Sequence, residues 1–396
     1  MLYRIEPNAI KREAGISLAS LLKEVMILSY RITAKRAMLY LSLLLVTCIL
    51  FTSCSTQPKT ISEGTEYVVI HSRSQQESSG IFGLNGDGEL TEELNKSDMQ
   101  DLSFFALDDN YLLVSGGRSN DNALFDLSQD GNFSEIHWLN EPKYSGVTAV
   151  EIYNKSAFVV MNGNYNDETY LNLVVEQDFA GNVIHQNIIE LYCRDILIQN
   201  DQASIAGKYI KRNDGDNSWQ ASIIAYDITN QKIITQHKYE KYNCFWEIES
   251  LDGTIYCIAE DKSESKNTIC TIDADTHEVL SDVQIEDQLT GLEIYDNELY
   301  VIGNKGIYRM TADLQVEEVA TVACSNGEYV NWAYIFDDSY YIFVRKQQRE
   351  LINGDYQYGQ LVQVDLRTLE SNSIPIMRSK KNTLDDILIF PTKIFK

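Results

Sequence analysis

The sequence predicts an all-β fold in which seven copies of one four-stranded unit close into a ring. Three observations lead to this prediction. A strand–turn–strand pattern recurs at intervals of about 40 to 50 residues. The two ends of the repeated region each hold only part of a unit. A separate apolar segment of different composition precedes the repeats.

Each unit opens with an apolar strand, a tight polar turn and a second apolar or aromatic strand. Two copies read TAVEIYNKSAFVV from Thr148 and TGLEIYDNELYVIG from Thr290. A third strand, a turn and a fourth strand follow, and Asp in that turn bonds its own backbone. The repeat resembles the blades of β-propellers, which have four strands in about 40 to 45 residues. The other copies start at Ser103, Asp195, Trp246 and Asn331. The Asp residues in the turn between the third and fourth strands are Asp126, Asp227, Asp273 and Asp365.

The two ends of the repeats complement each other. Near the N-terminus, EYVVIHS from Glu66 and the segment after it supply strands two to four of a unit that has no first strand. The C-terminal DDILIF from Asp385 fits a first strand and closely copies RDILIQ from Arg194. Pairing the ends removes an exposed sheet edge. The sequence therefore predicts a seven-bladed β-propeller over residues 65–396, closed by its C-terminal strand.

The N-terminal segment predicts export from the cytoplasm. Residues 38–51 are uncharged and mostly apolar, and Arg31, Lys35 and Arg36 precede them. A run of about 14 residues is typical of a signal peptide, because a spanning helix needs about 20. We expect residues 1–53 to be a signal peptide with a helical apolar part. Translation from Met26 would give a conventional signal, which would make residues 1–25 a mis-assigned start. An uncleaved signal anchor is the competing interpretation.

The end of this segment carries a lipidation signal. The string Leu50-Phe51-Thr52-Ser53-Cys54 resembles the lipobox of bacterial lipoproteins, although Phe51 stands where that family usually has Leu. The resemblance implies that Cys54 becomes the lipid-modified N-terminus of a protein held on the extracytoplasmic side of the cell membrane. Residues 54–64 are polar and are expected to form a flexible tether.

Composition and motifs narrow the function classes. The formal net charge of −25 disfavours nucleic acid or an anionic bilayer surface as a partner. The five His are scattered without metal-site spacing, and no motif predicts a cofactor or a catalytic nucleophile. Cys257 and Cys270 are expected to lie opposite each other in one hairpin, as a disulfide or as two buried thiols.

Alignment of the first strands yields one column of mostly polar residues near the strand start. A ring of such side chains would line the mouth of the axial channel. It could bind a ligand or an ion, or it could simply solvate the channel. The column contains Ser103, Thr148, Asp195, Trp246, Thr290, Asn331 and Asp385.

Two connections between second and third strands are predicted to be long loops on the same face as that mouth. They span residues 208–220 and 345–359 and are rich in basic and aromatic residues. Binding residues often lie on loops of a rigid scaffold, and Trp, Tyr and Arg are common anchors. Ordinary solvated insertions are the alternative. The candidate binding residues are Tyr209, Arg212, Trp219, Arg345, Arg349, Tyr356 and Tyr358.

Together these features predict a lipid-anchored, extracytoplasmic β-propeller that acts as a binding or scaffold module. Its expected partner is an anionic glycan, a peptide or another envelope protein. The alternative is a propeller-fold envelope enzyme, a hydrolase or lyase, with an axial metal held by Asp195, Asp385 and Asn331.

Overall fold

The computed structural model describes Lys23, Ile61 and residues 64–73, 76–97, 99–118, 121–129, 132–141, 143–166, 168–213, 216–311, 313–322, 324–346, 356–378 and 386–395. The chain divides into two compact units, Met1–Lys59 and Thr60–Lys396, and every strand belongs to the second. The predicted signal helix, apart from the helical Lys23, and Cys54 lie outside the described residues. Within those residues, no helix combines the length and apolarity that a membrane crossing requires.

Seven antiparallel sheets of four strands make up the second unit, and we call them blades 1 to 7. Blade 1 contains β28 (Asp386–Pro391), β1 (Tyr67–Arg73), β2 (Gln76–Leu84) and β3 (Leu90–Ser97). Blade 2 contains β4 (Leu102–Leu107), β5 (Tyr111–Gly116), β6 (Asp121–Asp126) and β7 (Asn132–His137). Blade 3 contains β8 (Val147–Tyr153), β9 (Ser156–Tyr165), β10 (Tyr170–Asp178) and β11 (Val183–Ile189).

The other four blades follow in chain order. Blade 4 contains β12 (Tyr192–Gln199), β13 (Gln202–Asn213), β14 (Asp216–Asp227) and β15 (Lys232–Tyr239). Blade 5 contains β16 (Cys244–Leu251), β17 (Thr254–Glu260), β18 (Lys266–Asp273) and β19 (Val279–Gln284). Blade 6 contains β20 (Leu289–Tyr295), β21 (Glu298–Gly303), β22 (Gly306–Met310) and β23 (Val316–Thr321). Blade 7 contains β24 (Glu328–Phe336), β25 (Ser339–Lys346), β26 (Tyr356–Asp365) and β27 (Ser371–Arg378).

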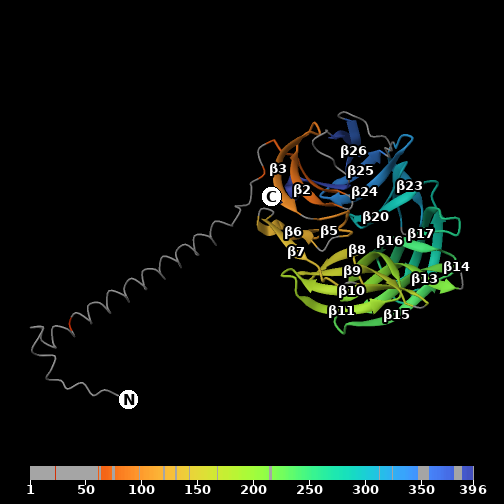
Figure 1. Ribbon diagram of the computed structural model, residues 1–396. Coiled ribbons are helices and arrows are strands. Elements are labelled where there is room, and N and C mark those ends of the chain that lie inside the picture. Colours follow the sequence, from red (N-terminus) through yellow and green to blue (C-terminus); the bar gives the residue numbers. More distant parts are fainter. Residues whose placement is uncertain are drawn as a thin grey trace, which may run out of the picture. The chain divides into compact units, whose positions relative to one another are not determined.

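The blades stand radially around one axis, with the first strand of each blade innermost (Figure 1). Inner strands of successive blades contact each other from β28 through β4, β8, β12, β16 and β20 to β24. The predicted seven-bladed β-propeller is thereby confirmed. Two short 3-10 helices, η1 (Leu127–Gln129) and η2 (Thr392–Phe395), complete the described elements.

The C-terminal strand closes the ring as predicted. β28 pairs antiparallel with β1, with Ser72 opposite Asp386 and Tyr67 opposite Pro391. Trp332 of β24 donates its indole N–H to the Ile387 carbonyl at 2.6 Å, which joins blade 7 to blade 1. After β28, η2 buries Phe395 against Phe125 of blade 2, with ring centroids 5.2 Å apart.

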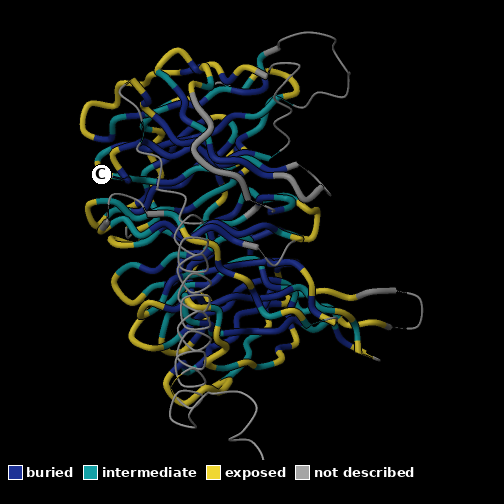
Figure 2. Tube along the Cα trace, turned by 60° about the vertical axis from the view of Figure 1, so that its left-hand side comes forward, coloured by how far each residue is buried: buried dark blue, intermediate teal, exposed yellow. Residues whose placement is uncertain are grey.

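Apolar side chains from facing blades form the core. Figure 2 shows buried residues along the strands and exposed residues at the turns. Alternate residues of an inner strand face opposite neighbours. Val150 and Ile152 of β8 accordingly pack towards blade 2, whereas Ala149 packs towards blade 4. Burial between sheets on both sides explains why the inner strands read as nearly continuous apolar runs.

Two local predictions are also confirmed. The Asp carboxylates of the turns between third and fourth strands accept backbone N–H groups, for example Asp273 from Thr276 at 2.7 Å and Asp365 from Thr368 at 2.7 Å. Cys257 and Cys270 are directly opposite in the β17–β18 ladder. Both are buried free thiols, which is one of the two states expected.

Candidate functional site at the channel mouth

Inner strands of blades 2 to 7 share a β-bulge near their start. The pairing register shifts at this point in each of them. The bulge explains the polar column seen in the sequence, because residues at a bulge leave the regular inward and outward alternation. The residues at the shift are Ser103, Thr148, Arg194, Trp246 with Glu247, Thr290 and Asn331.

Blade 4 requires a correction to that column. Its register shift lies between Cys193 and Asp195, so Arg194 occupies the bulge and Asp195 lies one residue further along β12. The Asp195 carboxylate accepts the Ile196 N–H at 2.9 Å and, across the blade boundary, the Ile248 N–H at 2.8 Å. Asp195 therefore ties β12 to β16. The extra residue of a bulge leaves no mark in an apolar pattern, which explains the shifted alignment.

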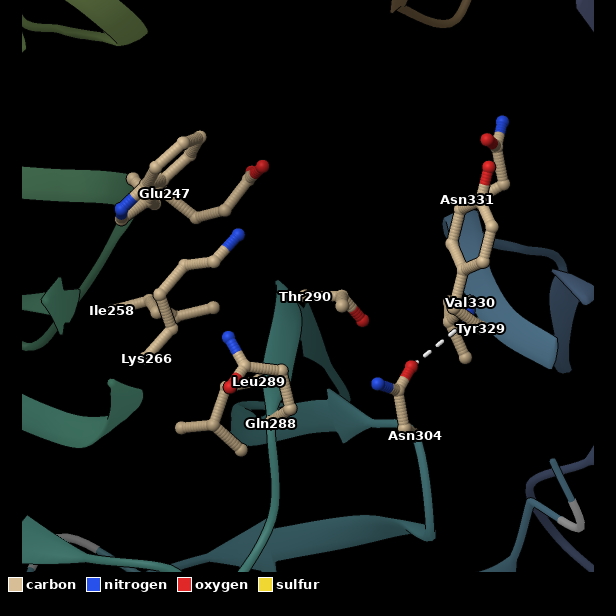
Figure 3. Close-up of a pocket in the computed structure, with 11 residues that line it drawn as sticks. Glu247, Ile258, Lys266, Gln288, Leu289, Thr290, Asn304, Tyr329, Val330 and Asn331 are labelled. Carbon is tan, nitrogen blue, oxygen red and sulfur yellow. Dashed lines mark hydrogen bonds between the residues drawn. The ribbon is translucent and has the colours of Figure 1, made fainter. Parts of the chain in front are cut away.

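A pocket of about 370 Å³ opens at this mouth between blades 5, 6 and 7. Three residues of the predicted column, Trp246, Thr290 and Asn331, line it together. Figure 3 shows Glu247 and Lys266 on one side, Tyr329 and Asn331 on the other, and Thr290 and Asn304 between them. The last residue of the column, Asp385, lies outside the described residues.

The short turn between β21 and β22, residues 304–305, borders the pocket. Asp287 holds this turn by accepting the Lys305 N–H at 2.8 Å. Gly303 permits the close approach, because a Cβ there would lie 2.1 Å from Asp287 Oδ2. Asn304 sits at the turn and accepts the Val330 N–H at 2.9 Å, so its amide is fixed facing the pocket (Figure 3).

Lys266 and Arg194 place positive charge around Trp246. The Lys266 ammonium lies 3.8 Å and the Arg194 guanidinium carbon 3.9 Å from the indole centroid. Burial and the Arg194 charge lower the pKa of Lys266. Arg194 Nε is buried without a hydrogen-bond partner among the described residues. Trp246 itself is held by Glu260, which accepts its indole N–H at 2.8 Å.

A chain of cation–ring and ring–ring contacts continues from this point over blades 4 and 3, and we call it the cation–aromatic array. Arg194 lies 4.6 Å from the Tyr192 centroid, and Tyr192 contacts Tyr170 at 5.4 Å. Tyr170 contacts Tyr165 at 5.1 Å, and Arg212 lies 5.8 Å from Tyr165. The array thus has Lys266 at one end and Arg212, a predicted binding residue, at the other.

The predicted loop at residues 208–220 is mostly strand. β13 and β14 form one hairpin of twelve residues on each side, and Lys211 bridges to Thr169 of the neighbouring blade. Tyr, Ile and Trp in this stretch favour extended backbone, which the loop interpretation overlooked. Tyr209 contacts the Lys238 ammonium at 3.3 Å, and Trp219 contacts Lys208 at 5.1 Å. These two rings therefore flank the cation–aromatic array without belonging to it.

The candidates of blade 7 lie in or beside the second long connection. Arg345 is the second-last residue of β25. Its guanidinium carbon lies 5.1 Å from the Tyr358 centroid, and it forms an ion pair with Asp386 at 3.2 Å. It is directly opposite Tyr329, which lines the pocket. Arg349 and the side chain of Tyr356 lie outside what the structure describes.

Sequence reasoning missed a group of carboxylates along the axis. Burial raises the pKa of Glu151 to about 7 and that of Glu249 to about 8, and the Asp195 charge adds to both shifts. Burial likewise raises the pKa of Glu247 and Glu293 well above the usual range. A signal was present: the quoted repeats set Glu151 and Glu293 between apolar residues, in VEIY and LEIY.

The axial metal of the enzyme hypothesis has no support in the described part of the chain. There, no three His, Cys, Asp or Glu side chains are grouped closely enough to hold a metal ion. The two Asp195 oxygens already accept backbone N–H groups. Asn331 faces the pocket, and Asp385 is not described.

No protein-family model and no curated protein matches the chain. Solved structures do match. A periplasmic gluconolactonase from Pseudomonas aeruginosa, PpgL, matches with a TM-score of 0.51 and 9% sequence identity. The match covers 82% of this chain and 98% of the gluconolactonase chain. A functionally unknown protein from Desulfotomaculum acetoxidans has a TM-score of 0.51 and 11% identity, covering 81% and 98%. Apo AztD from Citrobacter koseri has a TM-score of 0.42 and 9% identity, covering 83% and 98%. The likeness is one of fold.

Proposed function

We propose that this chain is a lipid-anchored, extracytoplasmic β-propeller that binds an anionic carbohydrate at the channel mouth. The observation that carries the proposal is the pairing of Lys266 and Trp246 in a pocket whose other polar groups are amides, hydroxyls and the Glu247 carboxyl. Burial raises the pKa of Glu247 well above the usual range, which favours its uncharged form. Lys266 has no ion-pair partner among the described residues. In a chain of net charge −25, a half-buried lysine without such a partner is a site for an external anion.

The other pocket groups suit a sugar. Gln288, Asn304 and Asn331 each offer an amide that can donate and accept, and Thr290 adds a hydroxyl. Such neutral groups match the alternating donors and acceptors of sugar hydroxyls. The Trp246 indole supplies an apolar wall for a ring face. The cation–aromatic array would extend the same chemistry over blades 4 and 3 for a longer chain.

The dimensions favour a carbohydrate over the other partners that the sequence allows. A volume of about 370 Å³ lies within the range of small-ligand pockets, roughly 300 to 1,000 Å³. A stable protein partner would need about 800 Å² of contact on each side, most of it outside this concavity. A peptide or an envelope protein would then engage the array without filling the pocket.

A titration of acidic oligosaccharides tests the proposal. Galacturonate and glucuronate oligomers should bind the purified full-length chain and change its tryptophan fluorescence. Lys266→Met keeps the aliphatic stem and removes the charge, so affinity should fall about tenfold or more. Trp246→Ala should weaken binding by a similar factor through loss of the apolar wall. Isothermal titration calorimetry gives the dissociation constants.

The matched control is Lys232→Met, because Lys232 is an exposed lysine on the outer strand β15. Its affinity should equal that of the wild type. Neutral glucose and galactose oligomers should bind at least about tenfold more weakly than the acidic ones. Equal affinity for neutral and acidic oligomers, or unchanged affinity in Lys266→Met, would contradict anion recognition at this pocket.

A further inference from the structure

The β-bulge of β16 places a carboxyl group in the pocket beside its aromatic wall. The register of β16 and β17 shifts at Trp246 and Glu247, which together stand opposite a single residue of β17. Consecutive side chains of a regular strand point to opposite faces of the sheet. At this bulge both side chains line the same pocket. The bulge therefore brings an ionisable group to the place where an anion is expected to bind.

Glu247 and Lys266 share the pocket without forming an ion pair with each other. Both residues line it, and Figure 3 shows the carboxyl and the ammonium projecting from the same side. Lys266 has no ion-pair partner among the described residues, so its ammonium stays available to an external anion. A ligand carboxylate that contacts Lys266 would then lie close to the Glu247 carboxyl as well.

The protonation state of Glu247 decides how the pocket receives such a ligand. An ionised Glu247 would repel the carboxylate held by Lys266, because like charges in a partly buried site are costly to bring together. A protonated Glu247 can instead donate its O–H to the ligand, and hydrogen bonds of this charge-assisted kind are short and strong. An anion therefore binds more tightly when Glu247 holds a proton. By linkage, the bound anion raises the affinity of Glu247 for that proton by the same factor.

The surroundings of Glu247 favour the protonated form before a ligand arrives. Burial is the largest cause of the raised pKa of Glu247, and neighbouring carboxylates add to it. Lys266 is the group that opposes this shift, because its positive charge favours the ionised carboxylate. The other charged or titratable groups on the surrounding strands β12, β16, β20, β24 and β25 are Arg194, Asp195, Glu249, Glu293, Tyr329 and Tyr340.

We propose that the pocket takes up a proton with each acidic sugar that it binds, and that Glu247 holds this proton. The coupling rests on the carbohydrate binding proposed above and makes that binding depend on pH. Affinity falls as the pH rises, because Glu247 of the free chain loses its proton and must regain it before the anion is held well. The pocket would thus retain an acidic oligosaccharide at neutral pH and release it in alkaline surroundings.

Calorimetric titration of the full-length chain with galacturonate oligomers tests the coupling, with circular dichroism to show that the chain stays folded at each pH. The dissociation constant should increase at least about fivefold from about pH 7 to about pH 9, where the ligand carboxylates stay ionised. At about pH 8, the binding enthalpies in HEPES and Tris should differ as proton uptake requires. Equal affinity at every pH with equal enthalpies, or tighter binding at high pH, would overturn the coupling alone. Absence of binding at every pH would overturn the carbohydrate proposal and the coupling with it.

Two variants separate Glu247 from Lys266, which can also lose its charge at high pH because burial lowers its pKa. Glu247→Gln keeps a donor that does not titrate, so at about pH 9 it should bind at least about fivefold more tightly than wild type. Lys266→Arg stays charged throughout, so its pH dependence should persist. Glu278→Gln, at an exposed position, is the matched control and should keep the wild-type pH dependence. Persistence of the pH dependence in Glu247→Gln, or its loss in Lys266→Arg, would assign the proton to Lys266 and overturn the role of Glu247.

Discussion

Glu249 shows how a single side chain in the channel opposes folding at high pH. Its pKa rises from the usual 4.5 to about 8 in the folded chain, first through burial and then through the Asp195 charge. Between these pH values the folded chain holds a proton that the unfolded chain has released. Because the folded state binds more protons there, the free energy of unfolding falls as the pH rises from about 4.5 through about 8.

Glu249→Gln should therefore stabilise the protein in a pH-dependent way. The amide keeps the shape without the charge, so the free energy of unfolding should rise by about 4 kcal/mol at about pH 8.5 and change little at about pH 4. Urea unfolding at both pH values measures this. Glu278→Gln is the matched control, because Glu278 is exposed, and it should stay within about 0.5 kcal/mol of wild type at either pH. A loss of stability at both pH values would mean that the carboxylate acts as a structural acceptor.

At this scale the sequence predicted some site residues and not others, for physical reasons. Trp246, Thr290 and Asn331 were found because one mostly polar column recurs near the start of the first strand in each repeat. Lys266 was missed because it starts the third strand of blade 5, and only the fold brings it to Trp246. Arg194 was missed because the bulge displaced the alignment by one residue.

Among the elements, hairpin length decides where the mouth is open. In blade 6, the turn between β21 and β22 is short and leaves the pocket uncovered. In blade 4, by contrast, β13 and β14 form a long hairpin with twelve residues in each strand. The spacing of the sequence repeat and the residues in its turns were sufficient to predict all seven blades and the closing strand. They could not tell that residues 208–220 continue as paired strands, because that depends on pairing across the hairpin and to Thr169.

The closing strand gives the prediction at this scale. Removing residues 384–396 deletes β28 and η2, exposes the edge of β1 and uncovers Phe125. An open edge of this length is a template for aggregation, so the truncated chain should elute as aggregates in size-exclusion chromatography. A synthetic peptide of residues 384–396, added during refolding, should restore the monomer. The same peptide with Ile389→Lys should not, because Ile389 is fully buried. A monomeric truncated chain with wild-type melting temperature would show that closure is dispensable.

For the whole molecule, charge is distributed unevenly between surface and mouth. The chain carries 58 acidic and 33 basic residues, which keeps it soluble and repels most anions. Against that background, the cation–aromatic array and Lys266 gather positive charge on the face that also holds the pocket. Selectivity for an anionic ligand would then come from the local positive charge at the mouth, because the negative net charge of the chain repels anions elsewhere.

Attachment to the membrane is the last prediction for the whole chain, and it rests on Cys54 as the proposed lipid acceptor. If Cys54 carries the lipid, Cys54→Ala should move the protein from the membrane fraction to the soluble fraction, because residues 54–64 are polar and residues 1–53 are expected to be removed. Cys48→Ala is the matched control, since Cys48 lies in the apolar run before the cleavage point and should not affect attachment. Mass spectrometry of the N-terminal peptide should find the lipid on Cys54. Residues 38–51 still present in the wild-type chain, together with retention of Cys54→Ala in the membrane fraction, would instead establish the uncleaved signal anchor.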